Sequence, residues 1–250
     1  MSEQLNNLYS LAKLETFSPD AFKSDDIVPQ DVCNFVLALS LVFNDLRDLI
    51  QLHNAIVSQK PEGEFKINRK WGTYNGIWLH SLRLGISLVH EVLNLVNKNS
   101  KVLEHTFFKS VLKQIPREAR DQWSDIVQAS QGKQVDTPFG KFALFIRNKI
   151  SFHYDPKEIF KGYSQFFSSQ NDASASAFVS RGSSMSKTRF YFADAAVRGY
   201  FTKEDEIHDV EQIITKIVDL MDNLNFSLMS IIHHFIQKRG FGYKIATEET

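Results

Sequence analysis

The chain has 250 residues, with 29 Lys and Arg against 29 Asp and Glu, so its formal net charge is zero. A chain of this length can bury one large core or two small ones, and its neutrality gives no global electrostatic attraction to nucleic acid. Short, interrupted apolar runs argue against a transmembrane helix, and the N-terminus lacks the basic-then-apolar pattern of a secretory signal. The single cysteine, Cys33, excludes an internal disulfide. We therefore expect a cytoplasmic protein.

The first half of the chain has the spacing of amphipathic helices. A short helix is expected over residues 5–14. Apolar residues then recur at intervals of three and four over residues 30–58 and again over residues 73–96, which places them on one face of a helix. Residues 100–128 predict two further helices, because Pro116 divides that stretch.

The second half is less regular until its last helix. A helix after residue 156 is expected to be short, because Gly162 and then Ser168, Ser169, Asn171 and Asp172 break it. Residues 164–188 are rich in Ser, Ala, Gly and Asn, which predicts an exposed, mobile loop. Short β-like runs at 177–179 and 189–192 predict a hairpin there. The last helix is expected over 202–239, where apolar residues follow one another at spacings of three and four as in a coiled-coil seam.

These elements predict an all-α fold, namely a helical bundle of five to seven helices with a small β-hairpin excursion before a long C-terminal helix. We expect a single domain over residues 1–250. Its helical core would comprise residues 30–163 and 202–239. Residues 164–200 would form the Ser-rich β excursion.

The stretch between Thr137 and Pro156 combines clear helix signals with a group of polar residues. Thr137 followed by Pro138 is typical of an N-cap and a first helical residue, so a helix should start there. Pro156 disfavours helical dihedral angles at Asp155, so that helix should stop near Tyr154. A new helix should begin at Pro156.

Arg147, Asn148 and His153 lie near the end of this predicted helix. At about 100° per residue, Arg147 and His153 fall on opposite sides of the apolar stripe that contains Ile146 and Ile150. They are about 120° apart around the helix and about 9 Å apart along its axis. One straight helix cannot easily bring them together. Two copies packed across the stripe could, because each would contribute its Arg and His to a shared seam.

The spacing R-N-x(4)-H, formed by Arg147, Asn148 and His153, resembles the signature of the HEPN superfamily of helical ribonucleases and nucleotide-binding domains. The family pattern is an Arg, usually followed by a polar residue, with a His four to six residues further on. The match covers about ten residues of the chain, including the flanking apolar positions. The helix-then-break context and the all-helical chain add weight to it.

The resemblance implies a metal-independent endoribonuclease that works as a homodimer, without a cofactor, with its active site at the dimer interface. It also implies a toxin or phage-defence setting in a bacterium, with an antitoxin or regulatory protein as partner. In such an enzyme His153 would act as the acid/base and Arg147 would hold the phosphate. Asn148 would orient Arg147 or a phosphate oxygen.

Two alternatives stay open. Arg and His near a helix C-terminus interact favourably with the helix dipole, so Arg147 and His153 are also candidates for simple stabilisers of the helix end. The chain would then be a non-catalytic HEPN-like dimerisation module, or a module that binds RNA or a nucleotide. The long seam of the last helix supports that alternative, because it needs only packing.

No other pattern in the chain points to a metal or cofactor. The eight histidines show no metal-binding spacing, and phosphate-binding glycine loops are absent. The motif S-x-x-K occurs at Ser184 and again at Ser10, which shows how little it specifies. Residues 141–203 carry 10 Lys and Arg against 4 Asp and Glu, and residues 204–250 carry 4 against 9. The basic segment would suit an RNA backbone, or it would pair with the acidic last helix.

Overall fold

The computed structural model describes residues 15–63, 68–149, 156–168, 177–203 and 210–245. Two-residue strands at either end of this span, β1 (Glu15–Thr16) and β2 (Lys244–Ile245), pair antiparallel. The described residues otherwise form two 3-10 turns and nine α-helices: η2 (Pro19–Phe22), α2 (Gln30–Val57), α3 (Arg69–Lys98), α4 (Ser100–Leu103), α5 (Thr106–Leu112), α6 (Arg117–Ser130), α7 (Pro138–Lys149), α8 (Pro156–Ser168), η3 (Met185–Lys187), α9 (Tyr191–Lys203) and α10 (Val210–Lys238). The all-α prediction is confirmed. The helix expected over residues 5–14 lies outside the described residues.

By its internal contacts the chain divides into two compact units. Unit 1 comprises residues 1–51, 88–150 and 220–250, and unit 2 comprises residues 52–87 and 151–219. The chain passes from one unit to the other within the long helices α2, α3 and α10. Each unit is therefore assembled from separate stretches of the chain. The single domain over 1–250 stays a prediction.

The core of unit 1 is built around three aromatic side chains from three helices. Phe35 of α2 packs edge-on against Phe108 of α5, with ring centroids 5.6 Å apart, and lies 6.5 Å from Trp123 of α6. All three are buried. Aromatic pairs at such distances contribute about 0.5–1.5 kcal/mol beyond the burial of their area. The cluster therefore joins segments that are far apart in sequence.

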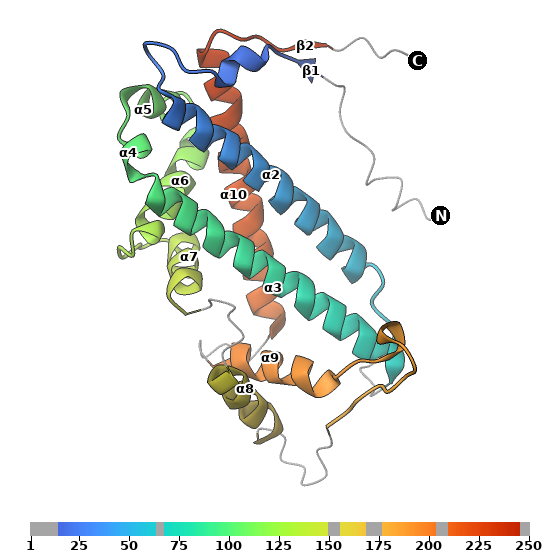
Figure 1. The fold of residues 1–250 in the computed structure, drawn as a ribbon. Coiled ribbons are helices and arrows are strands. Elements are labelled where there is room, and N and C mark those ends of the chain that lie inside the picture. The colour runs from blue at the N-terminus through green and yellow to red at the C-terminus, as the bar shows by residue number, and fades with distance from the viewer. Residues whose placement is uncertain (1–14, 64–67, 150–155, 169–176, 204–209, 246–250) are drawn as a thin grey trace. The chain divides into compact units, whose positions relative to one another are not determined.

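Helix α10 supplies a long buried apolar face to unit 1. Hydrogen bonds fix its rotation against α6: the Ser227 hydroxyl donates to the Ala119 carbonyl (3.1 Å), and the Gln122 amide donates to the Asn223 side chain (3.0 Å). In Figure 1, α2, α6 and α10 lie side by side in this unit. The predicted seam is buried there at Leu220, Met221, Leu224, Leu228, Ile231 and Phe235.

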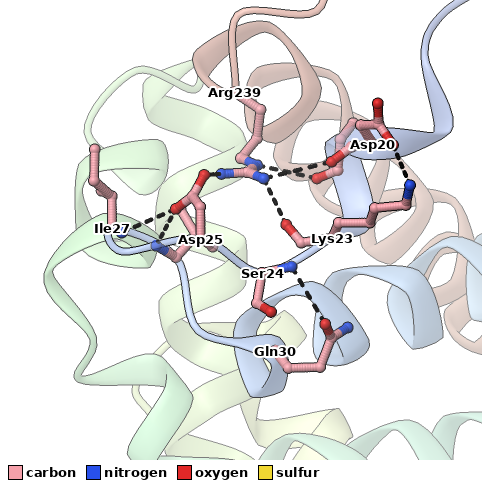
Figure 2. A network of polar contacts seen from close by, with 9 residues as sticks. Asp20, Lys23, Ser24, Asp25, Ile27, Gln30 and Arg239 are labelled. Atoms are coloured by element: carbon pink, nitrogen blue, oxygen red, sulfur yellow. Dashed lines mark hydrogen bonds and ion pairs between the residues drawn. The ribbon is translucent and has the colours of Figure 1, made fainter.

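The C-terminal end of α10 is tied to the N-terminal segment by Arg239 (Figure 2). The guanidinium pairs with Asp25 and donates to the backbone carbonyls of Ala21 (3.1 Å) and Lys23 (2.6 Å). The Arg239 side chain is only 7% exposed. Asp25 in turn accepts two backbone N–H groups at the entry to α2. One buried cation thus holds both ends of the described chain.

In unit 2, α8 and α9 cross at two buried glycines. A Cβ on Gly199 would collide with the carbonyl of Gly162 and with Phe166. The lack of a side chain lets the two backbones approach, which offsets the roughly 1 kcal/mol that glycine costs relative to Ala inside a helix. Helix α8 therefore runs through Gly162 and ends at Ser168, so the predicted break at Gly162 is wrong and the one at Ser168 agrees with the helix end.

The segment 164–200, predicted as a β excursion, is helical at both ends, because α8 extends to Ser168 and α9 begins at Tyr191. In place of the predicted hairpin there is one isolated antiparallel bridge between Ser180 and Arg189. The turn η3 lies in the loop between these two residues. The aromatic residues at 190–192 have high strand propensity, but tertiary contacts override it, as described below.

Side-chain caps account for most of the other differences in helix boundaries. Helix α3 begins four residues earlier than predicted, because the Asn68 side chain accepts the N–H of Trp71 (3.0 Å). The single helix expected before Pro116 is two short helices, since His105 caps the start of α5. Thr202, the expected start of the last helix, belongs to α9. This splitting raises the number of helices above the predicted five to seven.

Candidate functional site

Helix α7, which carries the first part of the R-N-x(4)-H motif, begins as predicted. Gly140 donates its N–H to the Thr137 hydroxyl oxygen (3.0 Å), so Thr137 is the N-cap and Pro138 the first helical residue. The Thr137 hydroxyl donates to Asp125 of α6 (2.5 Å). A Cβ on Gly140 would collide with Val135. The start of this helix is thus fixed both by its own cap and by contacts with the preceding part of the chain.

Arg147 and Asn148 lie in the last turn of α7. Phe142 of the predicted apolar stripe is buried, but the side chains of α7 are described only as far as Leu144. His153 falls in the stretch 150–155, outside the described residues. The structure therefore places two of the three predicted site residues on one helix.

The connection after the motif agrees with the sequence where it is described. Helix α8 begins at Pro156, as predicted. Asp155, which precedes Pro156, lies outside the described residues, and so does the expected end of the motif helix near Tyr154. The distance from Arg147 to His153 and the contacts of both side chains lie outside them too.

A second candidate region is the loop of residues 177–192 in unit 2. Ser180 and Arg189 exchange two backbone hydrogen bonds of 2.8 and 2.9 Å. The Thr188 hydroxyl accepts the N–H of Gly182 (3.2 Å) and donates to the carbonyl of Ser184 (3.0 Å). Internal hydrogen bonds thus satisfy much of the loop's backbone, and its Ser- and Gly-rich tip has a defined conformation.

The base of this loop is clamped onto α3. Arg189 donates two hydrogen bonds to Asp194 of α9, at 2.9 and 3.3 Å. Its guanidinium lies against Gly76, where a Cβ would collide with it, and the Tyr191 ring lies against Gly72 in the same way. Figure 1 shows this loop beside the N-terminal end of α3. These contacts explain why Tyr191 starts a helix here instead of ending a strand.

The rest of the loop faces solvent, and its composition is unusual for a surface. Five apolar side chains are exposed, with Met185 94% and Phe190 56% accessible: Phe178, Val179, Met185, Phe190 and Phe192. The rings of Phe190 and Phe192 are in edge contact, 5.8 Å apart. Arg181 and Lys187 are exposed and form no ion pair with any described residue. The loop thus combines aromatic rings with uncompensated positive charge.

A cavity of about 910 Å³ lies between the end of α2 and the start of α3, also in unit 2. Three cations, Lys60, Arg69 and Lys70, line it together with one acid, Glu62. The wall also includes the Tyr74 side chain. An open cavity with this lining suits an anionic group better than a cation.

A buried His–Ser pair joins α2 and α3 in unit 2. The Nδ1 of His53 lies 3.1 Å from the Ser81 hydroxyl oxygen, and that hydroxyl donates to the Trp78 carbonyl (2.8 Å). Because the Ser81 proton is used within its own helix, the His53 ring is the donor to Ser81. Burial lowers the pKa of His53. Both side chains are less than a tenth exposed, so the pair is a packing contact and offers no nucleophile to a substrate.

Within the described ranges, no group of three or more His, Cys, Asp or Glu side chains lies close enough to hold a metal ion. No helix in that part of the chain is both long and apolar enough to cross a membrane. Cys33 is buried, and burial raises the pKa of its thiol. A thiol in that state is a packing residue and a poor nucleophile.

Comparisons with protein-family models, with curated proteins and with solved structures find no match for this chain. The resemblance to the HEPN superfamily therefore rests on Arg147, Asn148 and His153 and on the all-α fold.

Sequence reasoning missed the docking of the 177–192 loop. The available signal was the pair Gly72 and Gly76, four residues apart on one side of α3. Glycines at that spacing inside a helix indicate the close approach of another segment. Which segment approaches is decided by Arg189 and Tyr191, more than 100 residues later in the chain.

Proposed function

We propose that this protein is a metal-independent endoribonuclease. The observation that carries the proposal is the place of the R-N-x(4)-H motif in an all-α chain. Arg147 and Asn148 lie in the last turn of a helix with a well-anchored start, and a new helix begins at Pro156. His153 lies between these two helices in the sequence, outside the described residues.

The chemistry follows from the residue types. His153 takes the proton from a ribose 2′-hydroxyl, whose oxygen attacks the adjacent phosphorus while the P–O5′ bond breaks. The leaving 5′ oxygen takes up a proton from water, and the His153 imidazolium returns its proton to the solvent. Arg147 stabilises the extra negative charge on the phosphate through two charge-assisted hydrogen bonds, and Asn148 orients that contact. The products carry a 2′,3′-cyclic phosphate and a 5′-hydroxyl. No step in this mechanism needs a cofactor.

We propose that the enzyme is a homodimer, because on the helix predicted to run to near Tyr154 the residues Arg147 and His153 fall on opposite sides of one apolar stripe. We further propose a toxin or phage-defence role, in which an antitoxin or regulatory protein keeps the cleavage in check. The basic balance of residues 141–203 supports contact with an RNA backbone.

The test is cleavage of a labelled RNA by the purified full chain, with and without a chelator. The wild type should cut with and without chelator and leave cyclic phosphate ends. Arg147→Ala and His153→Ala should each lower the rate at least about 100-fold, the usual contribution of an acid/base group. In cells, expression of the wild type should slow growth, and expression of either variant should not.

Matched controls come from exposed residues of the same types. Arg117→Ala on α6 removes a highly exposed Arg, and His80→Ala on α3 removes an exposed His. Both should cut RNA at the wild-type rate. Wild-type cleavage by His153→Ala, or 5′-phosphate ends on the products, would overturn the proposed mechanism.

A non-catalytic dimerisation or RNA-binding module is the second candidate, and one observation favours it. Leu37 and Leu41 lie one turn apart on α2 in unit 1 and are 54% and 62% exposed. Paired apolar residues on a helix surface are typical of a contact with another helix. Intact RNA and equal growth with wild type and His153→Ala would favour this candidate.

A further inference from the structure

We propose that the 177–192 loop, together with the first two turns of α3, binds single-stranded nucleic acid by stacking bases on its exposed aromatic rings. The surface belongs to unit 2, and none of its residues is part of the R-N-x(4)-H motif. The inference goes beyond the proposed cleavage, because a binding surface of this kind holds a strand whether or not the strand is cut.

The first support is that the loop is held in place before any ligand arrives. Two backbone hydrogen bonds join Ser180 to Arg189, and Thr188 ties the tip together. Arg189 is fixed by Asp194 on one side and by Gly76 on the other. A surface that is already ordered loses little conformational entropy on binding, so weak contacts suffice for affinity.

The second support is the rings themselves. Phe178, Phe190 and Phe192 lie within a loop of sixteen residues, and all three are exposed where folding alone would bury them. Phe190 and Phe192 are in a T-shaped contact, in which the edge of one ring meets a face of the other, and both side chains stay exposed enough to meet a planar partner. Base–aromatic stacking is tolerant of sequence, because every base presents a π-face.

The third support is charge. Residues 177–193 contain three Lys and Arg and no Asp or Glu. Asp194 neutralises Arg189, and Arg181 and Lys187 then remain as exposed cations of the loop. Two cations of the cavity, Arg69 and Lys70, lie on α3 about 10 Å along the helix axis from Gly76. Phosphates would meet these cations while the bases stack on the rings, the usual division in single-strand binding.

The same features disfavour two other occupants. In a lipid surface the apolar residues should form a continuous face, but the polar residues Ser180, Ser183 and Thr188 are interspersed among them in the sequence. In a symmetric dimer, the two-fold axis would bring the loop's cations against the same cations, with no acid of the loop to meet them.

The experiment uses labelled oligo(dT) and the full-length chain, with fluorescence anisotropy over a series of salt concentrations. Oligo(dT) lacks the 2′-hydroxyl, so the proposed cleavage cannot consume it, and binding is measured separately from cutting. Phe190→Ala should weaken binding about ten-fold or more without changing the salt dependence. Lys187→Ala should reduce the slope of log K against log salt by about 0.7.

Two control variants remove the same chemistry elsewhere. Leu41→Ala removes an exposed apolar side chain of α2, and Arg117→Ala removes an exposed cation of α6. Both should bind oligo(dT) like the wild type. Because binding to oligo(dT) is measured without cleavage, failure of the cleavage proposal leaves this one standing. Duplex DNA of the same length should compete poorly, because its bases are already stacked.

Several outcomes would overturn the proposal. One is equal affinity of Phe190→Ala, Lys187→Ala and the wild type for oligo(dT), and another is duplex binding as tight as that of the single strand. Binding to phosphatidylserine vesicles that Phe190→Ala abolishes, without binding to oligo(dT), would assign the loop to a membrane surface. A dimer that only Phe190→Ala dissociates, again without oligo(dT) binding, would assign it to a second copy of the chain.

Discussion

At the scale of single residues, Arg239 carries more of the fold than its position near the chain end suggests. Arg239 and Gly240 directly follow α10, at positions where a basic residue and a glycine usually stabilise and end a helix. Gly240 indeed has a positive φ of 81°. Arg239, however, is buried and bound to Asp25 and to the carbonyls of the η2 turn. Its partners lie more than 200 residues earlier in the chain.

Replacing this cation should therefore destabilise unit 1. We expect Arg239→Met to lower the free energy of unfolding by about 2–3 kcal/mol, because Met keeps much of the side-chain volume and removes hydrogen bonds to a charged group. Urea denaturation of the full chain measures the change. Arg117→Met, at a highly exposed site, should stay within about 0.5 kcal/mol of the wild type.

The pH dependence of this difference checks its cause. The Arg239 hydrogen bond, and then the N–H groups of Val28 and Ile27, lower the pKa of Asp25 below its ordinary value. A carboxylate with a lowered folded-state pKa stabilises the fold above about pH 4, and the stabilisation is lost as the pH falls through the folded-state pKa. The difference in the free energy of unfolding between the wild type and Arg239→Met should therefore become smaller in acid. A gap that stays constant down to about pH 2 would contradict the ion pair.

At the scale of elements, glycine decides two helix contacts in unit 2. Gly162 and Gly199 lie where α8 crosses α9, and Gly72 and Gly76 lie where the 177–192 loop docks on α3. By helix propensity alone, each of these glycines destabilises its helix relative to Ala. Close approach of a second segment reverses that balance, and it explains why none of the four ends its helix.

The crossing of α8 and α9 can be tested by adding one methyl group. Gly199→Ala should lower the free energy of unfolding by about 1–3 kcal/mol, because the new Cβ would meet the carbonyl of Gly162 and the backbone must shift. Thermal or urea denaturation gives the value. Gly242→Ala is the matched control, since nothing lies within 4 Å of a Cβ at that position. A Gly199→Ala variant more stable than the wild type would show that the crossing is looser than described.

At the scale of the whole molecule, assembly is the property on which the proposed chemistry depends. The cleavage proposal places the two-fold axis near the apolar stripe of α7, whereas the scaffold alternative favours the exposed leucines of α2. The two proposed interfaces predict different effects on the oligomeric state when one apolar residue of the interface is replaced by Asp. Static light scattering at micromolar concentration distinguishes them.

We expect the wild type to have the mass of a dimer, and Ile146→Asp to have the mass of a monomer, because a charge buried at the interface without a partner costs several kcal/mol. Leu41→Asp should remain dimeric and active. A dimer that Leu41→Asp dissociates and Ile146→Asp does not would move the interface to α2 and remove the argument for a shared active site.

Much of the helical architecture was predictable from the sequence, because the long helices bury one face each. The spacing of apolar residues predicts α2 to within one residue of its end and the seam of α10 at every described position. Thr137 and Pro138 predict the start of α7, where a cap acts over only three residues. Periodicity and capping are local properties, so the chain by itself determined these elements.

Tertiary structure decided the rest. The sequence predicts a hairpin over 177–192 and a break at Gly162, and both interpretations weigh only local propensity. Contacts with α3 and α9 replace the hairpin by a docked loop and carry α8 through its glycine. The candidate platform of exposed rings emerges from that docking, since Phe190 and Phe192 face solvent only because Arg189 and Tyr191 are held on α3. The physical reason is that a contact between distant segments contributes as much free energy as local propensity does, and the sequence does not reveal which segments will meet.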